Sequence, residues 1–267
     1  MTRVLDHGFI RVVDRMGNDA AIVQAARVSY GSGTKTPSDD VTLIRYLMRH
    51  GHTSPFEMCE VKFHIKLPIF VARQWLRHRT ASINEYSARY SEVDNEFYIP
   101  EPETLGTQGI HNKQGRSGSD SLDRDVKRGI SRKIESLSED AHKAYERLRA
   151  TDLARETARV VLPVNVYTRM YWKVNLHNLF HFLKLRMADN AQYEIRQYAK
   201  AIGKLVRDWV PVAYQAFEDY QLNSVILSAM EVEVLGKMLR GEKVDKDATG
   251  MSKREWKEFE QVWGAHG

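Results

Sequence analysis

The residues from Met58 to Leu67 alternate strictly between apolar and polar side chains. A period of two places successive side chains on opposite faces, so this run predicts a β-strand with one buried face. A second run, from Val164 to Val174, alternates in the same way and predicts another long strand. The apolar face of the first strand consists of Cys59, Val61, Phe63, Ile65 and Leu67. Any fold of this chain therefore has to include a β-sheet that buries these faces.

The segments around these two runs carry mostly helical signals. A further strand is predicted from Val4 to Asp14, and Gly17 ends it. Capping residues and helical spacing predict helices over residues 19–29, 39–50, 69–77, 122–148, 152–161, 175–187 and 191–220, with weaker ones over 225–240 and 252–263. Three or four strands among many helices, without a regular βαβ alternation, predict an α+β fold. We expect a mixed or antiparallel sheet of a few strands, flanked by several long helices, in a single domain.

Two segments differ in composition from the rest. Residues 104–121 are rich in Gly, Ser, Asn and Gln and have almost no apolar side chains, so we expect a mobile surface loop there. The helix expected over 122–148 has a basic, mixed-charge surface, which favours a solvated face over an RNA-binding one. Its apolar stripe would consist of Leu122, Val126, Ile130, Ile134, Leu137, Ala141 and Leu148. We expect residues 1–223 to form one domain and 224–267 a helical C-terminal extension.

Composition excludes several classes of protein. The net charge of +5 is mild for 267 residues, so nucleic acid is not indicated by charge alone. The one cysteine, Cys59, excludes an intramolecular disulfide framework and a Cys-rich zinc site. The opening MTRVLDHGF lacks the apolar run of a signal peptide, and the apolar run 67–72 is too short to cross a membrane. We expect a cytoplasmic, soluble protein, with neither a membrane nor nucleic acid as partner.

Arginines are concentrated in one stretch, between Arg73 and Arg89, where Glu85 is the single acid. The guanidinium fork binds phosphate or carboxylate in bidentate fashion, and nearby Ser, Asn, Tyr and Trp add neutral donors and stacking faces. No Walker loop and no GxGxxG occur, so any nucleotide has to be recognised by side chains. The stretch predicts a site for a phosphorylated, ring-containing ligand. The competing interpretation is that these arginines pair with acids elsewhere or lie on a solvated face.

The string RHRTASINEYSARY at residues 77–90 resembles the signature of the flavin-dependent thymidylate synthases. The resemblance also includes GHTSPFE at 51–57, RQW at 73–75, ARVVLPVNVYTRMYWKVN at 158–175, and the Leu-Arg pair that ends at Arg186. It covers roughly residues 4–220 and implies that residues 1–223 are the catalytic domain. Nothing functional carries over to the loop after Glu103 or to the tail after Asn223.

The resemblance implies a cofactor and a substrate for named residues. FAD would bind in a groove between subunits, in contact with Ser54, Arg77, His78, Arg79, Glu85, Asn175, Leu176, His177 and His181. Deoxyuridine monophosphate (dUMP) would be held by Gln74, Trp75, Leu76, Arg77, Glu85, Tyr86, Ser87, Ala88, Arg89, Arg159 and Arg186. Arg186 would be the catalytic residue, because a guanidinium can stabilise the negative charge of an ionised uracil without losing its own proton.

The implied activity is the methylation of dUMP to dTMP in a homotetramer that shares its sites between subunits. Methylenetetrahydrofolate would give the methylene group, and FAD reduced by NADPH the hydride. No cysteine nucleophile is expected, because Cys59 lies on the apolar face of a strand. Ser87 is interpreted as a binding donor, since no His or Lys base stands at a fixed relation to it.

The histidines allow other interpretations. His177 and His181 lie four apart on one helix face and could ligate a metal, but no third ligand follows at a recognisable spacing, so we expect no metal. His52 lies in the GHTSPFE segment, and its role stays open between structure and function. Two alternatives to a synthase also remain: a basic nucleic-acid-binding protein that uses the arginines and the helix 123–149, and a flavin reductase without methyl transfer.

Overall fold

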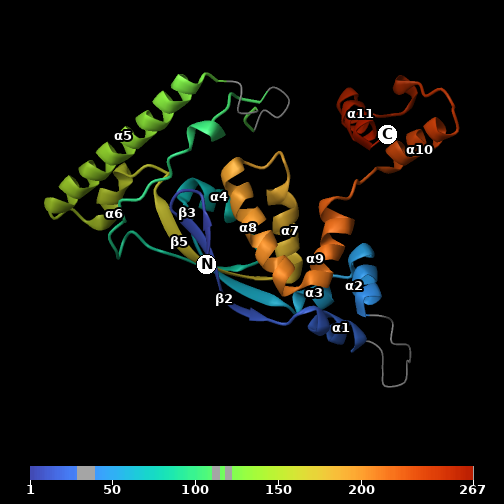
Figure 1. The fold of residues 1–267 in the computed structure, drawn as a ribbon, viewed down its shortest axis with the longest axis horizontal. Helices are drawn as coiled ribbons and strands as arrows, with labels where there is room; N and C mark the ends of the chain where they lie inside the picture. Colours follow the sequence, from blue (N-terminus) through green and yellow to red (C-terminus); the bar gives the residue numbers. More distant parts are fainter. Residues whose placement is uncertain (29–39, 110–114, 118–121, 267) are drawn as a thin grey trace. The chain divides into compact units, whose positions relative to one another are not determined.

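The computed structural model describes residues 1–28, 40–109, 115–117 and 122–266 (Figure 1). The chain divides into two compact units, Met1–Leu222 and Asn223–Gly267. The end of the helix expected over 19–29, the start of that expected over 39–50 and much of the expected loop 104–121 lie outside the described residues. Within that loop, a short bridge pairs Gln108 with Arg116.

The first unit is built on one antiparallel sheet of five strands in the order β1-β2-β3-β5-β4. This sheet and its helices confirm the predicted α+β class. The two strands predicted most clearly pair with each other, and Phe63 lies opposite Trp172 in their register. The strands are β1 (Thr2–Val4), β2 (Gly8–Met16), β3 (Glu60–Pro68), β4 (Ser82–Glu85) and β5 (Tyr167–Asn175).

The helices of the first unit confirm most of the predicted ones. They are α1 (Asp19–Arg27), α2 (Asp40–Arg49), α3 (Ser54–Glu57), α4 (Ile69–Trp75), α5 (Arg124–Ala150), α6 (Arg155–Ala158), α7 (Leu176–Met187), α8 (Tyr193–Trp209) and α9 (Pro211–Phe217). Short turns add η1 (Pro102–Thr104), η3 (Arg159–Val161) and the π-turn η4 (Glu218–Leu222). In Figure 1, α7 and α8 lie side by side, and both pack with the sheet.

The core lies between the sheet and these helices. Val61, Phe63, Ile65 and Leu67 are each at most 2% exposed, so the alternation of β3 identified the buried face correctly. Aromatic rings from three elements meet there: the Trp75 ring lies 5.1 Å from that of Trp172 and 4.5 Å from that of Phe182. Burying side chains of this size contributes on the order of 2–3 kcal/mol each. The C-terminal end of α4 is thereby fixed against β5 and α7.

The strand predicted from Val4 to Asp14 is found as β2, but it begins only at Gly8 and continues to Met16. The residues before it turn back into β1 and form a hairpin, in which Thr2 pairs with Ile10 and Val4 with Gly8. The turn between them contains Leu5 with a φ of 58°. A left-handed conformation is uncommon for leucine, so the sequence carries no turn signal at this position.

Two helix predictions also need correction. The helix expected over 191–220 is interrupted at Val210, because Pro211 has no N–H and cannot continue it. In α5, Val126 and Leu137 of the expected apolar stripe are more than half exposed. The buried positions are instead Lys127, Ser131, Ser138, His142 and Tyr145, because polar groups such as the Ser131 hydroxyl, which donates to the Pro100 carbonyl, face the rest of the unit.

The second unit is helical, as expected for the extension. It contains α10 (Ala229–Leu239), η5 (Lys246–Ala248) and α11 (Lys253–His266). A capping box formed by Ser228 and Glu231 begins α10. Lys246 pairs with Glu260 at 2.9 Å and so connects η5 to α11. In the part of the chain that the structure describes, no helix has the length and apolar character needed to cross a membrane.

Candidate functional site

A cavity of about 290 Å³ opens beside β5, where the chain leaves α4. Because Trp75 is buried at the end of α4, the next residues turn outward and run toward β4. Three segments meet at the cavity: the turn after α4, the end of β5, and one face of α7. Its lining consists of Arg77, His78, Arg79, Thr80, Trp172, Val174, Asn178, His181, Leu185 and Arg186. The structure thus brings together five of the residues implied by the resemblance.

Arg186 is held from two sides inside this cavity. Its Nε donates to Nε2 of His78 at 3.0 Å, and its Nη2 donates to the Gln74 carbonyl at 3.3 Å. Burial lowers the pKa of Arg186, but a guanidinium remains charged at any physiological pH. The cavity therefore contains a fixed, partly buried positive charge, whose effect on an anion is greater than that of a fully solvated one.

His78 is neutral under ordinary conditions. Burial is the main reason that its pKa falls to about 4, and the neighbouring Arg186 and His181 lower it further. Its ring centroid lies 4.9 Å from that of Phe182 and 6.0 Å from that of His181. A neutral imidazole can accept a hydrogen bond, so it is a suitable partner for Arg186, which can only donate.

Arg77 and Arg79 are exposed at the mouth of the cavity. Throughout the described ranges, no carboxylate lies within 4.0 Å of either guanidinium, nor of Arg73 or Arg159. Within the stretch 73–89, the interpretation that the arginines pair with acids elsewhere is therefore wrong for Arg73, Arg77 and Arg79, whose exposure agrees instead with a solvated face. The pairing interpretation holds for Arg89, which pairs with Glu156 at 3.2 Å. Arg77 and Arg79 leave their donors available to an anion.

The segment 85–89 follows β4 and is fixed to the edge of β5. Glu85 accepts from the Thr168 hydroxyl at 2.9 Å, and the Tyr86 N–H donates to the Arg169 carbonyl at 2.8 Å. The Ser87 Oγ accepts from the Arg89 N–H at 3.3 Å. None of the residues 85–89 lines the cavity that holds Arg186. Within one subunit, the implied substrate residues therefore fall into two groups.

Further implied residues lie apart from the cavity lining or use their side chains elsewhere. The side chains of Trp75 and Leu176 are fully buried, so a ligand could reach these residues only through the backbone. The Asn175 side chain caps α7 by accepting from the Asn178 N–H at 2.9 Å. The Gln74 side-chain amide donates a hydrogen bond to the Gln192 side chain. Leu76 is exposed. Neither Ser54, Ala88, Arg159 nor His177 lines the cavity.

Sequence reasoning missed Thr80 in the turn after α4 and four further cavity residues, Asn178 and Leu185 on the helix α7 and Trp172 and Val174 on the strand β5. Asn178 and Leu185 share a helix face with His181, at spacings of three and four residues, and this periodicity could have identified them. Trp172 is buried, but it also forms one wall of the cavity, which a pattern of burial alone does not indicate.

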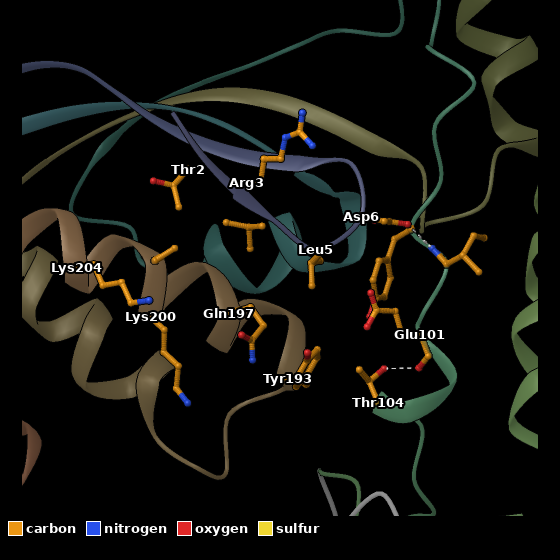
Figure 2. Close-up of a pocket in the computed structure, with 14 residues that line it drawn as sticks. Thr2, Arg3, Leu5, Asp6, Glu101, Thr104, Tyr193, Gln197, Lys200 and Lys204 are labelled. Atoms are coloured by element: carbon orange, nitrogen blue, oxygen red, sulfur yellow. Dashed lines mark hydrogen bonds between the residues drawn. The ribbon is translucent and has the colours of Figure 1, made fainter. Parts of the chain in front are cut away.

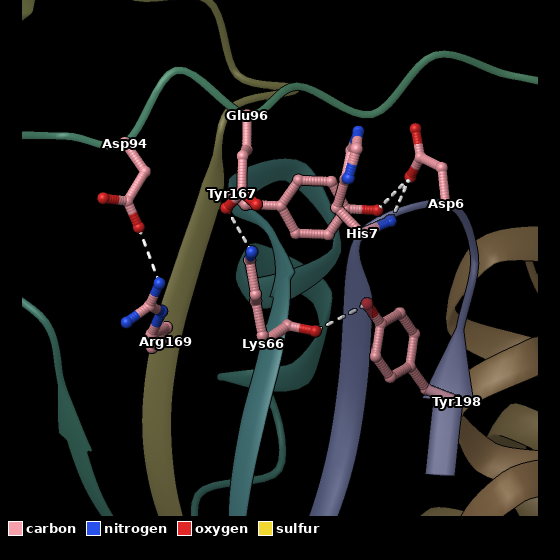
Figure 3. A network of polar contacts seen from close by, with 8 residues as sticks. All are labelled: Asp6, His7, Lys66, Asp94, Glu96, Tyr167, Arg169 and Tyr198. Atoms are coloured by element: carbon pink, nitrogen blue, oxygen red, sulfur yellow. Dashed lines mark hydrogen bonds and ion pairs between the residues drawn. The ribbon is translucent and has the colours of Figure 1, made fainter.

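A network of polar groups at one end of the sheet holds the segment that follows the arginine-rich turn (Figure 3). Arg169 pairs with Asp94 at 2.6 Å, and the buried Lys66 pairs with Glu96. The Tyr167 hydroxyl donates to Asp6, which also accepts from the Ile99 N–H at 3.0 Å. Since both β3 and the first hairpin contribute, this network ties residues 94–99 to the sheet.

A second cavity, of about 430 Å³, lies between β1, residues 98–104 and α8 (Figure 2). Lys200, Lys204, Gln197 and Tyr193 face it from α8. It shares no lining residue with the arginine cavity. Its lysines are exposed, and solvated lysines alone do not define a ligand site.

Cys59 and the two histidines of α7, His177 and His181, are the residues considered above as a nucleophile and as metal ligands. Cys59 is fully buried, and burial raises the pKa of its thiol to about 11. It is therefore a protonated core side chain, as predicted. In the described ranges, no three His, Cys, Asp or Glu side chains form a group that could hold a metal ion.

Fold and site together define the class: an α+β protein with an arginine-rich cavity for an anionic ligand beside an antiparallel sheet. Residues 11–212 match the family described as "Thymidylate synthase complementing protein". The chain is 57% identical over 98% of its length to a flavin-dependent thymidylate synthase of Ruegeria pomeroyi, which it covers to 87%. It is 55% identical over 97% of its length to that of Wolbachia pipientis, covered to 91%. The chain belongs to the family of flavin-dependent thymidylate synthases.

A solved structure agrees with this family. The UMP/dUMP methylase PolB from Streptomyces cacaoi, bound with 5-Br UMP, is 35% identical and superposes with a TM-score of 0.73. The match covers 83% of this chain and 98% of PolB. A second structure of PolB, with 5-Br dUMP, gives a TM-score of 0.72 at 34% identity.

Proposed function

We propose that this protein methylates dUMP to dTMP, with 5,10-methylenetetrahydrofolate as methylene donor and FAD, reduced by NADPH, as the source of hydride. The observation that carries the proposal is the cavity itself, in which Arg77 and Arg79, without an acidic partner in the described ranges, stand beside a fixed Arg186. Phosphate groups and an ionisable pyrimidine are the ligand features that such an arrangement favours. The family and the nucleotides bound in the PolB structures support the same reaction.

The donor set of the cavity fits a flavin dinucleotide. Arg77 and Arg79 offer charge-assisted donors to a pyrophosphate, and the N-terminus of α7, capped by Asn175, favours an anion through its free N–H groups. A cavity of about 290 Å³ is at the lower limit for one ligand, and is too small for a dinucleotide and a nucleotide together. This supports a site completed by a neighbouring subunit, to which His177, Ser54 and Glu85 would contribute.

Arg186 would act on the pyrimidine ring. The hydrogen bonds to His78 and to the Gln74 carbonyl keep its charge in place before the substrate binds. A preorganised cation stabilises a negative charge that develops on uracil, and it costs no reorganisation when the charge appears. Arg159 and the segment 85–89 are proposed to hold the substrate, and Arg89 would exchange its exposed ion pair with Glu156 for the substrate phosphate.

The proposed reaction needs no cysteine nucleophile. The buried thiol of Cys59, with its raised pKa, cannot attack a pyrimidine at neutral pH. In the described ranges, no histidine or lysine is hydrogen-bonded to the Ser87 hydroxyl, whose Oγ accepts from the Arg89 N–H, and a serine without a general base is a weak nucleophile. Replacing Ser87 by alanine should therefore leave turnover within about tenfold of wild type.

The proposed assembly is a homotetramer in the cytoplasm. Tyr171, Leu185 and Val164 are between 42% and 54% exposed on or near β5, and a second copy of the chain would cover such side chains. Light scattering of the purified protein measures the assembly directly.

The test of the reaction is the release of tritium from dUMP labelled at C5, with the folate, the reductant and the flavin omitted in turn. Release only in the complete mixture is the expected result, because methylation displaces the C5 hydrogen. NADPH oxidation that is indifferent to dUMP would favour a flavin reductase. A colourless protein whose DNA affinity falls steeply with salt would favour the nucleic-acid alternative.

The cofactor site is tested by the flavin content of purified variants. Arg77→Ala and Arg79→Ala should each weaken flavin retention, since a charge-assisted donor contributes about 1.5–3 kcal/mol. Arg73→Ala is the matched control, because Arg73 belongs to the same cluster and also lacks an acidic partner, but does not line the cavity. Equal flavin content in all three variants would remove Arg77 and Arg79 from the cofactor site.

A further inference from the structure

We infer that His78 is a positioning residue for Arg186: a neutral imidazole, protonated on Nδ1, holds the guanidinium through the lone pair of Nε2. The inference rests on the proposed function, in which Arg186 faces the pyrimidine. It goes further by giving His78 a role through Arg186 rather than a contact with the cofactor alone.

The hydrogen bonds determine which nitrogen of His78 carries the proton. Arg186 Nε lies 3.0 Å from His78 Nε2, and an arginine N–H can only donate. The Nε2 atom must therefore be the acceptor, and in a neutral ring the proton then lies on Nδ1. The Gln74 carbonyl is a second acceptor and accepts a hydrogen bond from Arg186 Nη2 at 3.3 Å. The guanidinium is thus tied to α4 and to the turn that also carries Arg77 and Arg79.

Packing fixes the orientation of the His78 ring. It meets Phe182 nearly edge to face, at an interplanar angle of 72°, and His181 at 63°. Phe182 is fully buried, so the ring packs against a rigid wall. A ring that cannot rotate presents its Nε2 lone pair in one direction, and this direction is where Arg186 lies.

The charges around His78 oppose its protonation. Two residues of α7, Arg186 and His181, face the His78 ring. Its sequence neighbours Arg77 and Arg79 line the same cavity. Among the residues that the structure describes, no acidic side chain lines this cavity. A cationic His78 would also place an N–H on Nε2 against the N–H of Arg186, and the hydrogen bond would be lost. Folding therefore selects the neutral acceptor, in agreement with the fall of the pKa to about 4.

The consequence concerns the remaining donors of Arg186. With Nε and one Nη2 hydrogen engaged by the protein, the other N–H groups of the fork are left for a ligand in a fixed plane. If His78 did not hold it, the guanidinium would lose orientation rather than charge. The structure therefore predicts an effect on the chemical step more than on the affinity for dUMP.

The first test does not depend on activity. Long-range proton–nitrogen NMR of the holoenzyme with nitrogen-15-labelled histidine reports the tautomer and charge of each ring, and His78→Gln assigns the His78 signals. The expected result is a neutral ring protonated on Nδ1 from pH 8 down to about pH 5, since its pKa is about 4. A proton on Nε2, or a cationic ring at pH 6, would overturn the inference whether or not the enzyme makes dTMP.

The second test is a double-mutant cycle in dTMP formation. His78→Phe keeps the aromatic packing and removes the acceptor, and it should lower kcat about tenfold or more while KM for dUMP changes by less than about threefold. His78→Gln restores an acceptor and should recover part of kcat. In an Arg186→Lys background, His78→Phe should add less than about threefold, because the lysine has no planar fork to position.

The outcomes separate this inference from the proposed function. If the fold-losses of kcat caused by His78→Phe and Arg186→Lys multiply in the double variant, His78 acts independently of Arg186. The flavin absorbance of each variant would then show whether His78 acts on the flavin. Full activity of Arg186→Lys would overturn the role proposed for Arg186, while the tautomer measured by NMR would still decide the state of His78.

Discussion

The arginines of the cavity differ in how much of their hydrogen-bonding capacity the protein itself already uses. Arg186 has two internal acceptors, whereas Arg77 and Arg79 have no acidic partner in the described part of the chain. A held guanidinium has a defined plane and suits a charge that appears only during the reaction. Exposed, unpaired arginines suit a phosphate that is charged throughout. Arginines of both kinds line the same cavity.

Arg186→Lys should therefore damage catalysis and spare the cofactor. Lysine keeps the charge but has neither the planar fork nor an Nε–H for His78, so it cannot take up the same position. We expect a folded, flavin-containing protein whose kcat for dTMP falls at least about tenfold, or ~1.4 kcal/mol. Tritium release measures kcat and absorbance near 450 nm (approximately the usual flavin band) measures the cofactor. A colourless variant would instead assign Arg186 to flavin binding.

Cys59 should be inert in the native protein. Its thiol is buried with a pKa raised to about 11, so almost none of it is thiolate at pH 8. We expect a thiol reagent to label the folded chain far more slowly than the chain in denaturant, and mass spectrometry counts the adducts. Rapid labelling at pH 8 without loss of structure would contradict the burial of this thiol. Cys59→Ser should reduce stability and leave kcat nearly unchanged, because serine places a more polar group in the core.

At the scale of elements, the helix α7 carries His181 and Arg186 into the cavity, and its first turn depends on one side chain. Asn175 caps this turn by accepting from the Asn178 N–H, and Asn18 caps α1 in the same way by accepting from the Ala21 N–H. Asn175 also accepts from the Asn178 side-chain amide at 2.9 Å, and only this cap belongs to a helix that lines the cavity.

Asn175→Ala should therefore lower both the stability of the protein and its retention of flavin, whereas Asn18→Ala should lower the stability alone. Loss of an N-cap costs about 1 kcal/mol, which corresponds to a fall in Tm of about 2–4 °C for a domain of this size. Calorimetry should give similar shifts for both variants, whereas flavin retention should fall only for Asn175→Ala. Equal retention would mean that the start of α7 does not form part of the flavin site.

The strands β3 and β5 could be predicted because their alternation directly records which face is buried. The hairpin of β1 and β2 could not, because its turn uses Leu5 in a conformation that is typical of glycine. The interruption of the helix at Pro211 was present in the sequence as a known helix breaker. For α5, the apolar spacing indicated the helix correctly but not its buried face, since Ser131 and His142 are turned inward.

Only those parts of the site whose residues are close in sequence could be predicted. The RHRTASINEYSARY string identified the turn that lines the cavity, because its residues are neighbours in sequence. The contact between His78 and Arg186 joins positions 108 residues apart, and no spacing rule indicates it. The division of the substrate residues into two groups likewise follows from the path of β4 along β5, and β4 is a short strand that the sequence pattern did not reveal.

At the scale of the whole molecule, the site and the extension belong to different units. All five strands and every residue that lines the arginine cavity lie in Met1–Leu222. The family match ends at residue 212, and PolB, itself matched over 98% of its length, covers only 83% of this chain. The relatives from Ruegeria and Wolbachia, in contrast, match nearly the whole chain, extension included. The folded catalytic unit is therefore expected to be complete without residues 223–267.

A chain that ends after Leu222 should fold, retain flavin and form dTMP within about threefold of the full-length rate, because no residue assigned to the site is removed. A chain that ends after Val210 is the control: it also loses α9, whose Ala213 and Phe217 are fully buried, and it should not fold. Calorimetry, flavin absorbance, light scattering and tritium release are compared for the two truncations and the full chain. If the chain ending after Leu222 folds but loses flavin, the extension contributes to the site, and if it loses only its assembly, residues 223–267 hold the subunits together.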